Sequence, residues 1–120
     1  FRSKRATFVG PTNDLAALFG AGDLFVLPTY YDPFSNACLE ALAAGLPVIT
    51  TPSNGFAEII VPGTHGAVVP EGDASALAEE LEKWRDPQAR EAARPARLAR
   101  AAEFSIERNA RETLRILEAQ

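Results

Sequence analysis

The sequence predicts an α/β fold in which a parallel β-sheet is flanked by helices and followed by a helical C-terminal tail. Short apolar runs alternate with segments of helical spacing, an order typical of parallel sheets with right-handed crossover connections. The runs are apolar throughout, as in strands that are covered on both faces. Four runs are expected to be strands: Ala6–Val9, Leu24–Leu27, Val48–Thr51 and Ala67–Val69.

Capping and stop residues place the helices between these runs. A first helix is expected over about Asn13–Ala21, with its first residue or Thr12 as the N-cap. The second should begin near Ser35 or Asn36, which are both good N-caps. It should end at Gly45 in the left-handed conformation, because glycine adopts that conformation without steric cost. A short helical turn is expected over residues 56–60.

The C-terminal third of the chain is expected to be helical. Asp73 caps one helix and Asp86 caps the next. The first position of that second helix is a proline, whose missing backbone N–H costs nothing there because the first N–H of a helix has no acceptor within the helix. Pro95 should break that second helix, and Ser105 should start a last one with an apolar side. The arginines between residues 85 and 115 alternate with glutamates, which predicts a solvated helix face.

Composition narrows the class of protein. At 120 residues the chain is long enough for one domain, and it opens on Phe1, so we expect a piece of a longer protein. The net charge is −4, and the first half lacks Lys and Arg after Arg5, which argues against nucleic-acid binding.

The single cysteine, Cys38, is expected to be buried filler, and His65 is expected to be a surface turn residue. One Cys and one His cannot form a structural zinc site. No apolar run approaches the length of a membrane span.

Two carboxylates near the second helix are the strongest functional signal. Asp32 lies in the loop after an apolar strand, and Glu40 lies on the following helix, with seven residues between them. Backbone N–H groups at a helix start attract an anion, while carboxylates accept hydrogen bonds from hydroxyl groups. A phosphate flanked by hydroxyls describes a nucleotide-sugar. The prediction requires both side chains to open into one pocket rimmed by the amides of residues 34–36. Turn and cap chemistry explains other polar loop residues but not Glu40, which stands in an otherwise apolar helix.

These residues belong to a longer pattern that resembles the donor-binding domain of family-4 retaining glycosyltransferases. The family signature is an acidic residue, seven others, Glu, Ala, a bulky residue, Ala, any residue, Gly, any residue, Pro and Val. It is matched by Asp32, Glu40-Ala41-Leu42-Ala43 and Gly45-Leu46-Pro47-Val48. The resemblance covers essentially the whole chain. It implies the Rossmann-like fold of a GT-B enzyme, with residues 1–120 forming the later part of the donor domain and the N-terminal acceptor domain absent.

The resemblance also implies roles for individual residues. Glu40 would bind the ribose, Asp32 and Phe34 the donor sugar, Ser35 and Asn36 the diphosphate, and Val9, Gly10 and Pro11 would lie near the base. No catalytic residue is implied within this chain, and no metal or other cofactor beyond a UDP-, GDP- or ADP-sugar donor. The family usually has Glu at position 32 and Gly at position 35, so the identity of the sugar stays open.

The implied reaction is transfer of a sugar to a lipopolysaccharide, lipid or polysaccharide precursor in a bacterium. The protein is expected in the cytoplasm, with peripheral association at the inner membrane face for the full-length form. The family's diphosphate-neutralising Arg and Lys lie upstream, and neither Lys4 nor Arg5 matches them. We therefore expect weak nucleotide binding and no turnover by this chain alone, since its missing domain is a required partner. The alternative is a non-catalytic α/β module that binds a nucleotide or a protein, because architecture alone does not assign function.

Overall fold

A three-stranded parallel sheet in the order β1-β2-β3 forms the middle layer of the computed structural model, which describes residues 4–120. The strands are β1 (Phe25–Leu27), β2 (Val48–Thr50) and β3 (Gly66–Val68). Ile49 at the centre of β2 lies opposite Val26 on one side and Ala67 on the other. Three of the four predicted strands are therefore confirmed, each within a residue or two of its expected bounds.

The fourth prediction, a strand over Ala6–Val9, is wrong. This segment has no strand conformation and lies outside the sheet, with Phe8 82% and Val9 63% exposed. Apolar composition predicts a strand only where a neighbouring strand can accept its backbone hydrogen bonds and a core can cover its side chains. Within the described part of the chain, this segment has no neighbouring strand and no core to cover its side chains. Its apolar composition was therefore not enough to make it a strand.

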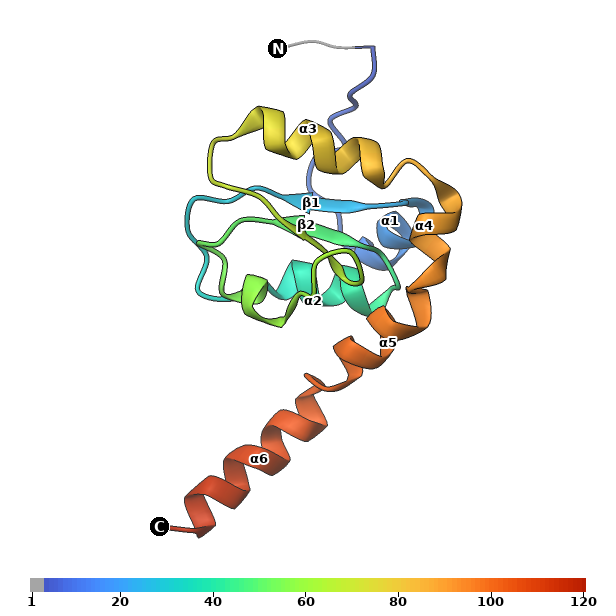
Figure 1. The fold of residues 1–120 in the computed structure, drawn as a ribbon. Coiled ribbons are helices and arrows are strands. Elements are labelled where there is room, and N and C mark those ends of the chain that lie inside the picture. The colour runs from blue at the N-terminus through green and yellow to red at the C-terminus, as the bar shows by residue number, and fades with distance from the viewer. Residues whose placement is uncertain (1–3) are drawn as a thin grey trace.

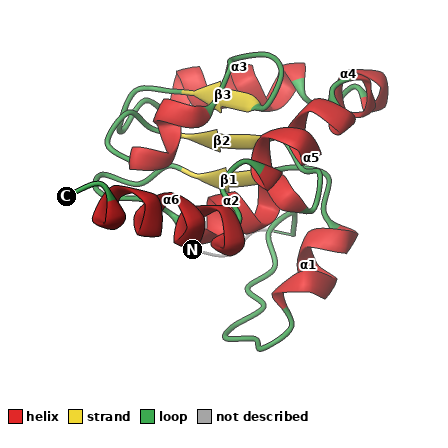
Figure 2. Cartoon of the chain, turned by 90° about the horizontal axis from the view of Figure 1, so that it is seen from below, coloured by secondary structure: helices red, strands yellow, loops and turns green. Residues whose placement is uncertain are grey.

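Helices cover both faces of the sheet, as Figures 1 and 2 show. On one face lies α3 (Ala74–Lys83), which packs over Ile49, Ala67 and Val69. On the other face lie α1 (Leu15–Ala21), α2 (Asn36–Ala43), the 3₁₀ helix η1 (Gly55–Ile59) and α5 (Arg94–Ala102). They bury a larger cluster made of Phe19, Cys38, Ala41, Leu42, Leu46, Val48, Phe56, Ile59, Ile60 and Ala101.

Most helix ends follow the capping rules. Ser35, Asp73, Asp86 and Ser105 each cap their helix with a side-chain oxygen, as predicted. The prediction for α1 is wrong by one or two residues, because its N-cap is Asp14, which accepts from the Ala17 amide. Thr12 instead accepts from the amide of Asp14 and so supports the cap.

Gly45 ends α2 as the sequence predicts. Its φ is +90°, and the amide of Leu46 donates to the Ala41 carbonyl while that of Gly45 donates to Leu42. This pair of bonds is a Schellman motif, which satisfies carbonyl groups that the helix end would leave free. The chain is thereby turned from α2 directly into β2.

The helical tail breaks where Pro95 predicts. α4 (Pro87–Ala92) and α5 are separate helices, and α6 (Ile106–Glu118) follows the N-cap Ser105. In Figure 1, α6 projects away from the rest of the molecule, and the structure including α6 has a longest dimension of 56 Å. Its apolar side chains Ile106, Leu114 and Leu117 are largely exposed. Within residues 4–120, no helix combines the length and apolar character needed to cross a membrane.

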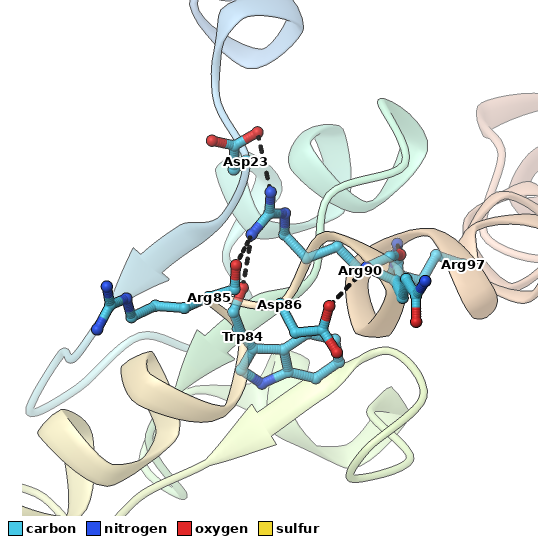
Figure 3. Close-up of polar contacts among 7 residues, drawn as sticks. Asp23, Trp84, Arg85, Asp86, Arg90 and Arg97 are labelled. Atoms are coloured by element: carbon cyan, nitrogen blue, oxygen red, sulfur yellow. Dashed lines mark hydrogen bonds and ion pairs between the residues drawn. The ribbon is translucent and has the colours of Figure 1, made fainter.

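The arginines of the tail are not all solvated, which corrects the sequence prediction. Arg97 is only 1% exposed, and it donates to the carbonyl oxygens of Gly45 (2.8 Å), Thr64 (3.2 Å) and Arg90. Arg90 donates to the carbonyls of Trp84 and Arg85 and pairs with Asp23 at 3.7 Å (Figure 3). Guanidinium groups satisfy carbonyls that the ends of α2 and α3 leave free, so they fasten the tail to the sheet domain.

His65 is also placed differently from the prediction. It is buried rather than exposed, and its Nδ1 accepts a hydrogen bond of 2.9 Å from the Val61 amide. Burial is the main cause that lowers the pKa of His65, and the positive charges of Arg100 and Arg97 add to it. The side chain therefore completes a turn before β3 as a neutral acceptor.

Candidate functional site

The loops that follow β1 and β2 meet at the carboxyl edge of the sheet. The Asp32 amide donates to the Ser53 carbonyl (3.2 Å), and the Gly55 amide donates to the Asp32 carbonyl (2.9 Å). A Cβ atom on Gly55 would lie 1.9 Å from the carbonyl oxygen of Pro33. The two loops are therefore in direct backbone contact, which requires glycine at position 55.

Of the four backbone amides at the start of α2, two donate to side chains of the fold and two have no acceptor in the described chain. Phe34 donates to a carboxylate oxygen of Asp32 (3.0 Å), and Ser35 donates to the side-chain oxygen of Asn54 (3.2 Å). Within residues 4–120, the amides of Asn36 and Ala37 have no acceptor. Of the three amides that the sequence analysis expected around the anion, only that of Asn36 is available, together with its neighbour.

Ser35 acts inside the fold. It is buried, and its hydroxyl oxygen accepts from the Cys38 amide at 3.1 Å. Both polar groups of Ser35 are thus engaged, its amide with Asn54 and its hydroxyl with the first turn of α2. A serine that caps the helix also explains why the position tolerates a residue other than glycine.

Glu40 lies on the outer side of α2. Cys38, Ala41 and Leu42 face the core, and at 3.6 residues per turn Glu40 falls on the opposite side with Asn36. Its carboxylate has no hydrogen bond or ion pair to any other residue of the described chain. It lines an open hollow of about 410 Å³, whose other walls are formed by α5 and the start of α6.

A second hollow, of about 620 Å³, adjoins the first and is lined by Phe34 and Asn36. The two share Leu39, Phe104 and Ile106 as walls, so they are neighbours, and the surface that contains both hollows is called here the α2–α6 groove. The structure therefore brings three of the predicted site residues to one surface: Phe34, Asn36 and Glu40.

Asp32 lines neither part of the α2–α6 groove. Its side chain is half-buried in the loop, with one carboxylate oxygen committed to the Phe34 amide. The expectation that both carboxylates open into one hollow is therefore not met by this arrangement of the chain. Val9, Gly10 and Pro11 are exposed and likewise lie outside the groove, since the segment that carries them does not join the sheet.

Two residues of this region have roles that the sequence analysis did not foresee. Asn54 is fully buried, and its side chain bonds to four groups that belong to α2 with its N-cap, β2 and η1. Glu71, in the loop after β3, accepts from both the amide (2.9 Å) and the hydroxyl of Ser53. The bond from the Ser53 hydroxyl is the main cause that lowers the pKa of Glu71. A cap signal was visible at Asn54, but its partners in other elements were not.

Cys38 is a buried core residue, as predicted. It is fully enclosed, and burial raises the pKa of its thiol. The part of the chain that the structure describes contains no group of three or more His, Cys, Asp or Glu side chains arranged to hold a metal ion.

Comparison with known proteins identifies the family. The family model of group 1 glycosyl transferases matches residues 2–86, well over half of the chain. The chain belongs to the group 1 glycosyltransferases. This family match contains β1 to β3, α2 and both carboxylates of the signature, and it confirms the resemblance inferred from the sequence.

Individual relatives support the assignment. The chain is 33% identical over 118 residues to the lipopolysaccharide core biosynthesis mannosyltransferase LpsB of Rhizobium meliloti, covering 95% of this chain and 34% of that protein. It is 39% identical over 102 residues to a glycogen synthase of Mycobacterium tuberculosis, covering 82% of this chain and 24% of that enzyme. The chain thus spans about a third or less of the length of these group 1 relatives.

A solved structure confirms the fold class. Sucrose-phosphate synthase from Thermosynechococcus elongatus superposes with a TM-score of 0.85 at 32% identity, over 94% of this chain and 29% of that one. The predicted Rossmann-like, GT-B type of architecture is therefore correct for this group 1 glycosyltransferase chain.

Proposed function

We propose that this chain is the later part of the donor-binding domain of a retaining glycosyltransferase, and that it holds a nucleotide-diphospho-sugar. The observation that carries the proposal is Glu40. This signature glutamate stands on a helix whose inner side is apolar, is exposed to the α2–α6 groove, and is unbonded within the described chain. A carboxylate so placed can accept hydrogen bonds from both ribose hydroxyls in a forked arrangement.

The diphosphate would lie at the start of α2. The free amides of Asn36 and Ala37 point out of the first turn, where the helix dipole favours negative charge. Phe34, which lines the same groove, would contact the donor sugar. Asp32 lies outside the groove, in the loop next to Phe34, and has one carboxylate oxygen that is not committed to the Phe34 amide. We assign that oxygen to a sugar hydroxyl at the edge of the groove.

Catalysis would depend on stabilising the departing nucleoside diphosphate while an acceptor hydroxyl attacks, with retention giving an α-glycoside. Backbone amides offset part of the charge that develops on the leaving group. Arg108 lines the part of the groove beside Asn36, but Glu103 and Glu112 line the same part, and no described arginine or lysine lines the part around Glu40. The groove therefore offers little net positive charge to the diphosphate. We therefore expect no turnover by these 120 residues alone.

The acceptor is proposed only as a class. The two relatives are named for lipopolysaccharide core biosynthesis and for glycogen synthesis, and both are similar to this chain. For this chain's protein we propose a saccharide hydroxyl as the acceptor. For the whole protein we propose action in the cytoplasm on a glycan or glycolipid precursor, with association at the inner face of the membrane when the acceptor is lipid-linked.

The test is an NMR titration of the isotope-labelled chain with UDP, GDP and ADP, comparing the native chain with Glu40→Ala. Two charge-assisted hydrogen bonds lost together should raise the Kd at least tenfold. Glu79→Ala is the matched control, because Glu79 is an exposed helical glutamate on α3, across the sheet from α2. Equal affinities of the native chain and Glu40→Ala for every nucleotide would refute the ribose role.

A further inference from the structure

Asn54 is a buried amide whose hydrogen-bonding capacity is fully used. It is 0% exposed and lies between β2 and η1. Its Oδ1 accepts from the amides of Ser35 (3.2 Å) and Phe56 (3.0 Å). Its Nδ2 donates to the Thr50 hydroxyl (3.0 Å) and to the Cys38 sulfur (3.5 Å). No other residue type of this size supplies two acceptor positions and two donors in one plane.

The partners of Asn54 belong to three different elements. Ser35 is the N-cap of α2, Phe56 is the second residue of η1, and Thr50 ends β2. The Thr50 hydroxyl in turn donates to the Leu27 carbonyl at the end of β1 (2.7 Å). One side chain therefore links the ends of two neighbouring strands to the first turn of the helix that follows one of them.

The backbone around Asn54 reinforces this link. Residues 53 and 55 bond to the amide and the carbonyl of Asp32, on either side of Asn54. The loop that carries Asp32 is therefore held in two ways. Its main chain bonds to residues 53 and 55, and the Asn54 side chain bonds to the amide of Ser35, the N-cap of α2. Since the Ser35 amide is taken by Asn54, the amides that face outward are those of Asn36 and Ala37.

We propose that Asn54 is a positioning residue of the donor site, an inference that rests on the function proposed above. It touches no substrate. It holds the α2 cap and the Asp32 loop in the arrangement in which the two free amides are presented to the diphosphate. Groups held in place before the ligand arrives avoid an ordering cost on binding, which is why such support raises affinity.

The experiment compares Asn54→Ala with Val69→Ala in the labelled chain. Val69 is a buried core residue under α3, on the opposite face of the sheet from α2, so its truncation reduces stability without touching the donor site. Thermal unfolding is measured for both variants, and hydrogen exchange of the Ser35 amide and the Kd for UDP, GDP and ADP are measured at a temperature where both are folded. If Asn54→Ala does not fold, Asn54→Asp replaces it, because aspartate keeps the acceptor and removes both donors.

We expect the Asn54 variant to exchange its Ser35 amide faster, because that amide loses its acceptor, and to bind the nucleoside diphosphate at least fivefold more weakly. Val69→Ala should unfold at a lower temperature, with a Kd within twofold of native. A merely structural role would lower the unfolding temperature of both variants and leave both Kd values unchanged, which would overturn the inference. Unchanged hydrogen exchange of the Ser35 amide would also overturn it. If the native chain binds no nucleotide, the proposed function itself fails, and Asn54 has no site to position.

Discussion

The buried guanidinium of Arg97 offers the sharpest test of how the helical tail is held to the sheet. Arg97 lies on α5, and its three acceptors are carbonyl oxygens of Gly45, Thr64 and Arg90. No carboxylate pairs with it within residues 4–120, and burial lowers its pKa. Arg97→Ala removes all three bonds and leaves the Gly45 carbonyl, which is buried, without a partner.

The expected loss follows from two opposed effects. A hydrogen bond to a charged group contributes about 1.5–3 kcal/mol, and an abandoned buried acceptor costs about 1–3 kcal/mol. Replacing the buried guanidinium by an uncharged side chain removes the free-energy cost of desolvating that charge, which offsets part of this loss. We expect a net reduction of about 3 kcal/mol in the free energy of unfolding. With an unfolding entropy of about 0.25 kcal/mol per kelvin for a chain of this length, the Tm should fall by about 12 °C.

Urea denaturation followed by circular dichroism measures this difference. Arg111→Ala is the control, because Arg111 is exposed on α6 and makes no hydrogen bond or ion pair in the described chain. It should change the free energy of unfolding by no more than about 0.5 kcal/mol. Arg97→Lys keeps the charge but reaches fewer carbonyl groups, so its free energy of unfolding should lie between those of Arg97→Ala and Arg111→Ala. An Arg97→Ala protein as stable as Arg111→Ala would refute the view that these carbonyl bonds anchor the tail.

Three further outcomes are expected. Gly66→Ala should prevent folding, because its Cβ would lie 1.7 Å from a carbonyl oxygen of β2, whereas Gly20→Ala meets no atom within 4 Å and should be neutral or stabilising in thermal melts. The lowered pKa of His65 means that the unfolded chain binds its proton first, so urea-unfolding stability should fall as pH drops below about 6.5. His65→Asn, which can still accept from Val61, should flatten that dependence, and an unchanged slope would contradict the assignment. Cys38 should resist a thiol reagent until urea unfolds the chain, whereas rapid labelling of the native chain would contradict its burial.

Several features of the fold could be predicted because their causes are local. Ser35, Asp73, Asp86 and Ser105 cap their helices through atoms two or three residues away, and Pro95 interrupts a helix through its own ring. Gly45 ends α2 because its conformation needs no distant partner. The order of apolar runs and helices was likewise enough to predict a parallel sheet, and the family match confirms the class.

The candidate site was only partly predictable. The spacing of the signature placed Glu40 on α2, and the helical repeat alone puts it opposite the core residues. The sequence could not reveal that the amides of Phe34 and Ser35 donate to side chains within the fold. Nor could it show that Asp32 turns toward its own loop while Glu40 faces the start of α6, because those contacts depend on how separate elements pack.

By itself, the sequence determined where most helices begin and end, three of the four runs that were expected as strands, and which family the chain joins. Tertiary structure alone decided the burial of Arg97 and His65, the exclusion of Ala6–Val9 from the sheet and the linking role of Asn54. The physical reason is the reach of each interaction. Caps, turns and helical periodicity act within one or two turns of chain, whereas Asn54 meets Ser35 across 19 residues and Arg97 meets Gly45 across 52.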